Sequence, residues 1–187
     1  QTKARKGQLT DQNIERLMKL HLINFNEEQK RKIEDGATHI FALHNEMIEH
    51  NIQMLNQTCS EHNPAAIIKA VTPQGKNSHY NNRNVPKMTP ICIGAQVALT
   101  CRNIQPLWGL HNGAVGKVKG IYFKNKDDNP NNGNMPLFVA VHFPNYCGPA
   151  WIKNHPKLVP IAPIDVPCSK CSHGACFRKI IPLVLSW

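Results

Sequence analysis

The clearest pattern of hydrophobic and polar residues lies within residues 91–123. Hydrophobic side chains alternate with small or polar ones over residues 91–99, and a period of two is typical of a half-buried β-strand. Gly94 interrupts this run, which indicates a bulge or a close backbone approach. Asn112 and Gly113 provide a turn sequence, because both residue types tolerate positive φ angles. The pattern therefore predicts strand, loop and strand.

Three further hydrophobic stretches extend this β-rich region. In residues 114–123, Gly116 and Gly120 interrupt the pattern, as expected where a strand bends around a small barrel. Residues 137–143 alternate with a period of two, and residues 158–161 form a hydrophobic run of strand length. Together with the first strand, these stretches predict a small β-barrel.

The N-terminal region predicts two consecutive helices. Residues 8–22 place hydrophobic side chains on one helical face, and Thr10 is in position to cap this helix. Asn26 and Gln29 have the spacing of a capping box, in which each side chain accepts a hydrogen bond from the other residue's backbone N–H. The second helix is therefore expected to begin after Asn26.

An α/β pattern follows these helices. Residues 38–43 form a short hydrophobic run, the kind of strand that lies inside a parallel sheet. The polar turn His44-Asn45 leads into an expected helix at residues 46–57, with Asn45 as its N-cap and one hydrophobic stripe facing the sheet. Residues 66–71 are expected to add a strand. Strand, polar turn and helix make half of an α/β unit, and such turns often hold ligands.

The predicted fold class is α/β with an all-β insert. Four parts are expected along the chain: an α/β part (1–75), a polar linker (76–90), a small β-barrel insert (91–165), and a cysteine-rich loop with a last strand (166–187). The last strand, residues 180–187, is expected to return to the first sheet. Pro182 would stand at its start, where a missing N–H is tolerated.

The charge of the chain favours an anionic partner. Lys and Arg total 22 and Asp and Glu total 12, which gives a net charge of +10 and a pI near 9.4. This balance favours nucleic acid over a membrane surface, although a solvated basic surface without a partner has the same composition. No stretch approaches the ~20 apolar residues of a membrane-spanning helix, so no membrane partner is expected.

The cysteines and the chain ends give the expected setting. Seven scattered cysteines in 187 residues favour reduced thiols inside the cell over a disulfide framework. The sequence has no initiator Met and ends on the hydrophobic residues 180–187, whereas chain termini usually lie in solvent. We therefore expect a segment of a longer intracellular protein.

Three stretches resemble the PIF-type branch of the PIF/RecD superfamily-one DNA helicases. THIFALHNEMIEHN (38–51) resembles the strand, turn and helix that open the family's second RecA-like motor domain. IGAQVALTCRNI (93–104) with GLHNGAVGKVKGI (109–121) resembles the family's barrel insert, a Gly-x-x-Val-Met run followed by Asn and then by Asn-Gly-x-x-Gly. RKIIPLVLSW (178–187) resembles the strand before the family's Thr-Ile-His-Lys-Ser-Gln-Gly motif.

The resemblance implies a partial RecA-like second motor domain carrying a small SH3-like β-barrel. It also implies a parent protein that uses ATP and Mg²⁺ to unwind DNA in the 5′-to-3′ direction, in the nucleus or mitochondrion of a eukaryote. The phosphate cradle Gly-x-x-x-x-Gly-Lys-Ser/Thr and an acidic magnesium motif are absent from these residues. Because phosphoryl transfer needs those groups, we expect no catalytic residues and no bound cofactor in the segment alone.

Two other functions are compatible with the sequence. The first is a free-standing basic nucleic-acid-binding module built on the small barrel. The second is a degenerate or transposon-derived fragment whose partner is a protein. The parent's coding sequence distinguishes them, because a helicase has Gly-Lys-Ser/Thr upstream and Ser-Gln-Gly downstream.

Candidate contacts with single-stranded DNA gather after residues 38–43 and in the expected barrel. They are His44, Asn45, Arg102, Asn103, Trp108, Asn112, Lys117 and Lys119. The lysines and Arg102 would bind phosphates, and Trp108 would stack on a base, a contact worth ~1–3 kcal/mol. In the alternative, Trp108 fills the barrel core, the lysines are ordinary surface charges, and Asn45 only caps its helix.

The C-terminal region contains a compact group of potential metal ligands. Cys168, Cys171, His173 and Cys176 place four soft ligands within nine residues. Zinc knuckles begin with Cys-x-x-Cys but space their remaining ligands further apart. We therefore expect a reduced loop insertion without metal, with zinc as the alternative.

Overall fold

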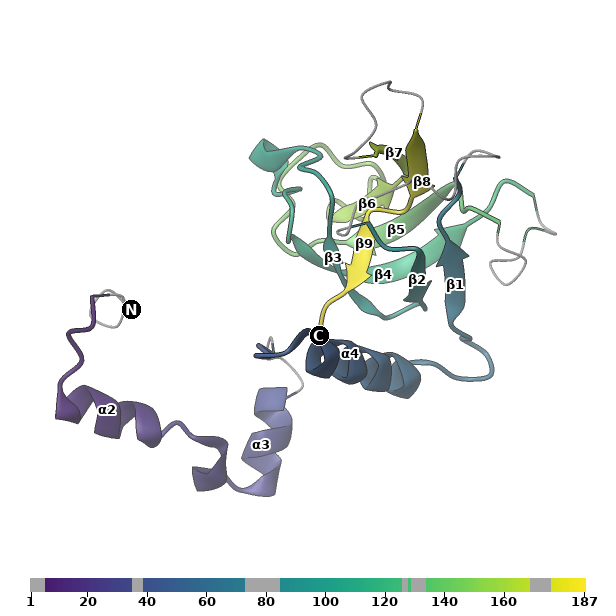
Figure 1. Cartoon of the computed structure of the whole chain (residues 1–187). Coiled ribbons are helices and arrows are strands. Elements are labelled where there is room, and N and C mark those ends of the chain that lie inside the picture. Colours follow the sequence, from purple (N-terminus) through teal and green to yellow (C-terminus); the bar gives the residue numbers. More distant parts are fainter. Residues whose placement is uncertain (1–5, 35–38, 73–84, 126–127, 129–133, 169–175) are drawn as a thin grey trace. The chain divides into compact units, whose positions relative to one another are not determined.

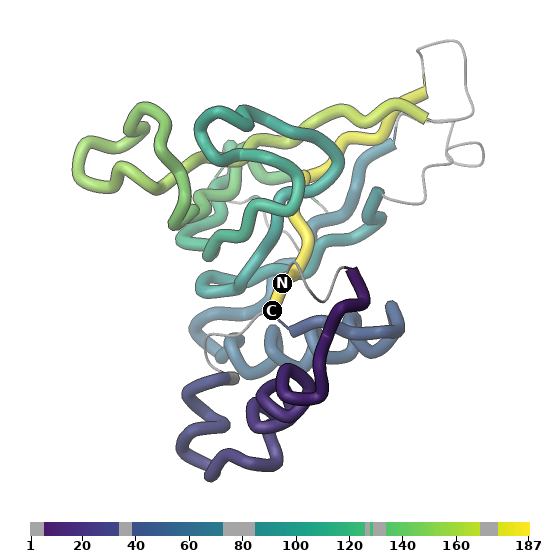
Figure 2. Tube along the Cα trace, turned by 90° about the vertical axis from the view of Figure 1, so that its left-hand side faces the viewer, coloured from purple at the N-terminus to yellow at the C-terminus, as the bar shows by residue number. Residues whose placement is uncertain are grey.

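A computed structural model of the protein divides into two compact units, Gln1–His39 and Ile40–Trp187. Figure 1 shows the helices and strands of both units, and Figure 2 traces the chain from a second direction. The structure describes residues 6–34, 39–72, 85–125, 128, 134–168 and 176–187.

The first unit consists of short helices. They are α2 (Asp11–Met18), the 3-10 helix η1 (Leu22–Asn24) and α3 (Glu27–Glu34). The N–H of Asn13 donates to Thr10 Oγ1 at 3.4 Å. The N–H of Gln29 donates to Asn26 Oδ1 at 2.9 Å, and the N–H of Asn26 donates to Gln29 Oε1 at 3.1 Å. Both predicted caps are confirmed, although α2 is shorter than the expected helix.

The second unit begins with a helix and continues as short strands. The helix is α4 (His44–Thr58), which confirms the helix expected at residues 46–57. The strands are β1 (Ala66–Lys69), β2 (Met88–Ile91), β3 (Gln96–Leu99), β4 (Val115–Tyr122), β5 (Phe138–His142), β6 (Leu158–Ile161), β7 (Ile164–Pro167), β8 (Phe177–Ile180) and β9 (Leu183–Leu185).

Five of these strands form the largest sheet. Their order is β6-β5-β4-β3-β9, and each neighbouring pair is antiparallel (Figure 1). The pairs β1-β2 and β7-β8 form separate antiparallel ladders. Among the described strands no ladder joins β6 to β9, so these two strands are the edges of the sheet. The β-rich region is thus an antiparallel sheet, and its closure into a barrel stays a prediction.

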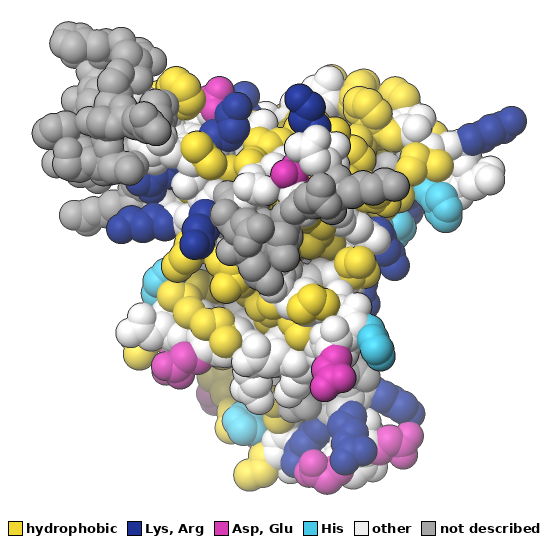
Figure 3. Space-filling model, turned by 90° about the vertical axis from the view of Figure 1, so that its right-hand side faces the viewer, with side chains coloured by type: hydrophobic (Ala, Val, Ile, Leu, Met, Phe, Trp, Pro, Cys, Tyr) yellow, Lys and Arg dark blue, Asp and Glu magenta, His cyan; other side chains and the backbone are white. Residues whose placement is uncertain are grey.

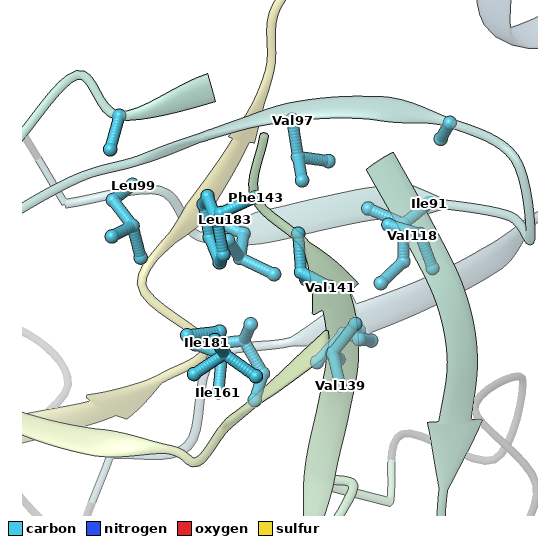
Figure 4. Packing of buried hydrophobic residues seen from close by; sticks show 14 of the residues in the cluster. Ile91, Val97, Leu99, Val118, Val139, Val141, Phe143, Ile161, Ile181 and Leu183 are labelled. Carbon is cyan, nitrogen blue, oxygen red and sulfur yellow. The ribbon is translucent and has the colours of Figure 1, made fainter. Parts of the chain in front are cut away.

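Alternate residues of the five-stranded sheet meet in one hydrophobic core (Figure 4). Val97 of β3, Val118 of β4, and Val139 and Val141 of β5 are all 0% exposed. Phe143, directly after β5, joins the same core. The period of two in the sequence is therefore the period with which these strands face the core.

The run at residues 91–99 divides into two strands at Gly94. Gly94 has a φ of +92°, a backbone conformation that glycine adopts without steric cost. Its neighbour Ile93 is 51% exposed, so the expected alternation fails there. The side chain of Asn63 holds this corner, because its Nδ2 donates to Ile93 O at 2.8 Å and its Oδ1 accepts from Ile93 N–H at 3.1 Å. The interruption at Gly94 is where the sequence predicts it, but it is a corner between two strands, and the single strand expected over residues 91–99 is wrong.

Residues 39–43 do not form the predicted strand. Ile40 is 94% exposed and Leu43 is 61% exposed. Every ladder among the described strands is antiparallel, so the expected parallel sheet is absent from this part of the chain. A hydrophobic run becomes a strand only where neighbouring strands complete its hydrogen bonds. Residues 66–71 do contain a strand, but β1 pairs antiparallel with β2.

Residues 180–187 do not return to a first sheet as predicted. β8 pairs with β7, and β9 pairs with β3 as an edge strand of the five-stranded sheet. Pro182 lies directly before β9, and its carbonyl accepts a hydrogen bond from Thr100 N–H at 2.9 Å. The position of Pro182 at a strand start agrees with the prediction, since its missing N–H interrupts no ladder.

The predicted hydrophobic stripe of α4 is only partly correct. Leu55 is buried, whereas Ile48 and Ile52 are 39% and 46% exposed. The other buried residue of the helix is polar: Asn51 donates from Nδ2 to a carbonyl of β9 at 3.3 Å and accepts at Oδ1 from Trp187 N–H at 3.0 Å. The C-terminus accordingly lies beside α4 (Figures 1 and 2).

Candidate nucleic-acid interface

Arg102, Asn103 and Asn112 lie in the loop between β3 and β4. The N–H of Asn112 donates to Asn103 Oδ1 at 2.7 Å, and the N–H of Gly113 donates to a carbonyl of β3 at 2.8 Å. Gly113 has a φ of +86°, as its turn sequence predicts. Arg102 is exposed. The side chain of Asn103 therefore braces the loop, while Arg102 is open to a ligand.

Trp108 ends the 3-10 helix η2 (Pro106–Trp108) and is half-buried against the core. Its carbonyl accepts from Cys147 N–H at 3.1 Å. A β-carbon at Gly148 would come within 2.8 Å of Trp108 Cδ2, so the ring lies against that loop. These contacts suit a packing role for Trp108 and leave only part of the ring for the predicted stacking on a base.

Lys117 and Lys119 point outward from β4. Both are exposed, whereas the residues directly before and after each of them in β4 are buried. The pairing of β4 with β5 shifts between Val118 and Gly120, which makes Lys119 the residue of a β-bulge. Bulges re-aim a side chain away from the regular alternation. The two predicted phosphate-binding lysines are therefore presented by a rigid strand. Figure 3 shows that other Lys and Arg side chains are scattered between exposed hydrophobic ones.

His44 and Asn45 are both exposed at the start of α4. The N-cap is Leu43, which makes no side-chain capping bond, so the predicted capping role of Asn45 is wrong. The helix begins too early for it, because a capping residue must precede the first helical residue. His44 lines a groove of 410 Å³ together with residues of β2 and β9, including Met88. The structure thus places these two candidates at α4, on a different element from the lysines.

The predicted contacts did not include the residues that share a cavity with Lys119. A cavity of 610 Å³ is lined by Lys119, His142, Asn154, His155 and Lys157 among others. His142 pairs directly with Lys117 across the β4-β5 ladder. Alternation in β5 indicates that His142 faces away from the core. Only the pairing of β5 with β4 and β6 brings His142, His155 and Lys157 beside Lys119.

The predicted metal-ligand group is only partly within the described residues. Cys168 and Cys176 are both 7% exposed, and the N–H of Cys168 donates to Cys176 O at 2.9 Å. Cys171 and His173 lie outside the described residues. Among the described side chains no three His, Cys, Asp or Glu residues are arranged to hold a metal ion. Zinc at this loop therefore stays an alternative.

The buried thiol of Cys92 is a poor nucleophile. The pKa of Cys92 is raised to about 12, chiefly by burial and then by a hydrogen bond with Cys59 and the charge of that neighbour. Burial also raises the pKa of Cys101. A thiol is nucleophilic as its thiolate, so a pKa raised to this degree leaves Cys92 neutral and inert near pH 7.

Among the described helices, none combines the length and apolar character of a membrane span. No known family profile matches the sequence, and no curated protein is significantly similar to it. The fold, in contrast, matches solved Pif1 helicases. The Candida albicans Pif1 helicase aligns with 96% of this chain at 18% identity and a TM-score of 0.57. Unliganded Bacteroides sp. Pif1 aligns with 100% of it at 14% identity and a TM-score of 0.60.

A structure of Bacteroides Pif1 bound to single-stranded DNA also aligns with 100% of this chain, at 14% identity and a TM-score of 0.55. The chain spans 37% of each Bacteroides protein and 43% of the Candida protein. At these identities the likeness is one of fold. From end to end, the chain has the mixed α/β fold of a segment of Pif1 helicases.

Proposed function

We propose that this chain is a segment of an ATP-dependent 5′-to-3′ DNA helicase and that it contacts single-stranded DNA during unwinding. The full-length likeness to Pif1 helicases carries the proposal, because Bacteroides Pif1 is solved bound to single-stranded DNA and in complex with ADP-AlF4. The net charge of +10 supports it, since release of counterions from phosphates drives such binding. In a eukaryote this helicase would act in the nucleus or mitochondrion.

In this proposal the chain contributes to one motor domain. Residues 1–75 belong to the second RecA-like domain, residues 91–165 form its SH3-like barrel insert, and residues 76–90 link the two. The C-terminal strand β9 completes one edge of the insert's sheet. The exposure of Ile40, at 94%, supports this organisation. An exposed Ile40 within a hydrophobic run of strand length is expected where the neighbouring strands come from other parts of the motor.

The isolated chain is expected to hydrolyse no ATP. ATP and Mg²⁺ would bind elsewhere in the parent protein, because the phosphate cradle and the magnesium carboxylate are absent from these residues. Phosphate release should be measured with Mg²⁺ and ATP, with and without oligo(dT). The same preparation must bind oligo(dT), which controls for unfolding. DNA-stimulated phosphate release above the protein-free rate would contradict the expectation.

The proposed DNA contacts are His44, Asn45, Arg102, Asn103, Trp108, Asn112, Lys117 and Lys119. The last two carry the sharpest test, because β4 holds both outside the core. The double variant Lys117→Glu, Lys119→Glu is expected to bind fluorescent oligo(dT) about tenfold more weakly at low salt. The slope of log K against log [salt] should fall by about 1.4, since each phosphate contact on a single strand contributes ~0.7.

The matched control reverses two exposed lysines on other strands, Lys69→Glu with Lys179→Glu. It changes the net charge equally but should leave the salt slope near that of the wild type. Equal slopes for the two double variants would show that only overall charge matters. An unchanged slope in the β4 variant would remove Lys117 and Lys119 from the interface.

A free-standing nucleic-acid-binding module is the second candidate function. The self-contained core of Ile40–Trp187 favours it, since this unit buries its own hydrophobic residues. The parent's coding sequence decides between the two functions. Gly-Lys-Ser/Thr upstream with Ser-Gln-Gly downstream supports the helicase, and the absence of both supports the module.

A further inference from the structure

The outward surface of β4, β5 and β6 is organised in rows by the strand pairing. Lys117 lies opposite His142, which lies opposite Leu158 on β6. At the far end of the same ladder, Tyr122 lies opposite Phe138. Val139 and Val141 alternate with these residues along β5 and join the core, so the rows face away from it. We call this surface the outer sheet face, formed by Lys117, Lys119, Tyr122, Phe138, His142 and Leu158.

One end of the outer sheet face is aromatic. The rings of Tyr122 and Phe138 stack with centroids 4.7 Å apart and planes at 22°. The Tyr122 ring also covers Gly120, where a β-carbon would come within 2.7 Å of Tyr122 Cε2. Tyr122 nevertheless stays 50% exposed. A ring that is fixed by its neighbours and open to solvent can stack on a nucleobase of any sequence.

The other end of the outer sheet face is cationic. Lys119, His142, His155 and Lys157 line the 610 Å³ cavity, and no Asp or Glu among the described residues lines it. Lys157 Nζ donates to the carbonyl of Pro144, which holds its charge beside the cavity. Ammonium and imidazole N–H groups without a competing carboxylate suit the oxygens of a phosphodiester.

We propose that the outer sheet face is a subsite for single-stranded DNA, with a base on Tyr122 and backbone phosphates in the cationic cavity. The subsite rests on the proposed function and adds Tyr122, His142, His155 and Lys157 to its contacts. Lys117, which pairs with the cavity residue His142, lies five positions along β4 from Tyr122, about 16 Å at ~3.3 Å per residue. The ligand must therefore be an oligonucleotide, because a mononucleotide cannot reach both ends.

The two ends predict different losses in an oligo(dT) anisotropy titration. Tyr122→Leu should weaken binding about fivefold to tenfold with an unchanged salt slope, because stacking releases no counterions. Tyr122→Phe keeps the ring and should bind like the wild type. Lys119→Gln with Lys157→Gln should lower the salt slope by about 1.4. The neutral control Lys69→Gln with Lys179→Gln should keep both affinity and slope.

Competition separates the possible sources of the phosphate. Unlabelled oligo(dT) should displace the probe, whereas thymidine monophosphate and inorganic phosphate at equal phosphate concentration should not. Displacement by inorganic phosphate would overturn the subsite in favour of a simple anion site. All variants should keep the wild-type melting temperature, and Tyr122→Phe guards against loss of folding at that position.

The subsite and the proposed function can be refuted separately. If the wild type binds oligo(dT) but Tyr122→Leu and Lys119→Gln with Lys157→Gln bind equally well, the subsite is wrong and the proposed function stands. If the folded wild type binds no oligo(dT), the proposed function itself fails.

Discussion

Gly116→Val is expected to lower the free energy of unfolding of the second unit by about 3 kcal/mol. Gly116 lies on the core side of β4, packed against β5 and Phe143. A β-carbon there would lie 2.6 Å from Val141 Cγ1, 2.8 Å from Phe143 Cδ1 and 2.9 Å from His142 O. One of these contacts is backbone, so the strand pair itself must move. Thermal unfolding should shift down by about 6–12 °C for a unit of this size.

The adjacent residue supplies the matched control. Lys117→Val places the same side chain one position along β4, but on the exposed face, and should change stability by less than ~0.5 kcal/mol. A double-mutant cycle of Gly116→Ala with Val141→Ala tests the cause, because Val141→Ala removes the nearest methyl group. The double variant should be more stable than the sum of the single effects by at least ~0.5 kcal/mol. Additive effects would show that Val141 is not the side chain that resists a β-carbon at this position.

Several features decided within a few residues were predicted correctly from the sequence, although the N-cap of α4 was not. The capping box of Asn26 and Gln29 depends on one helical turn, and the corner at Gly94 depends on one φ angle. The turn at Gly113 is equally local. Local geometry leaves such positions few alternatives, so the residue type reveals the structure.

Features decided by distant partners were not predictable in this way. Residues 39–43 have the composition of a strand but form no ladder with the described strands, and Ile40 is exposed instead. Residues 180–187 have the hydrophobic pattern of a strand, as predicted. Their strand β9 pairs with β3, and β8, which ends at Ile180, pairs with β7. Periodicity predicts which side chains of a strand are buried, but it does not predict which strand pairs with it.

The candidate site shows the same division. Alternation along β4 correctly places Lys117 and Lys119 outside the core. The sequence treats His142 and His155 as isolated surface histidines, because nothing local connects them. The pairing of β4, β5 and β6 brings both histidines to one cavity. Because they are 13 residues apart in the sequence, no local pattern predicts that they lie together. Such a group can be found from sequence only after the pairing of the strands is known.

Asn51→Ala is expected to lower the free energy of unfolding by about 1–3 kcal/mol and to loosen the C-terminal strand. Asn51 is 5% exposed, and its amide bonds both the Leu185 carbonyl at 3.3 Å and the Trp187 N–H at 3.0 Å. Removing it leaves these backbone groups without their partner where α4 covers them. Hydrogen exchange should therefore accelerate at Trp187 N–H more than in β4.

Two variants on α4 separate the hydrogen bonds from packing. Asn51→Leu fills a similar volume but cannot donate or accept, so it should show the same fast exchange at Trp187 as Asn51→Ala. Asn56→Ala removes an exposed amide from the same helix and should leave both stability and exchange unchanged. If Asn51→Leu restores wild-type exchange, the contact of α4 with the C-terminal strand depends on buried volume. Slow exchange in the wild type that is lost in both Asn51 variants would instead identify one polar side chain as the link between this helix and the five-stranded sheet.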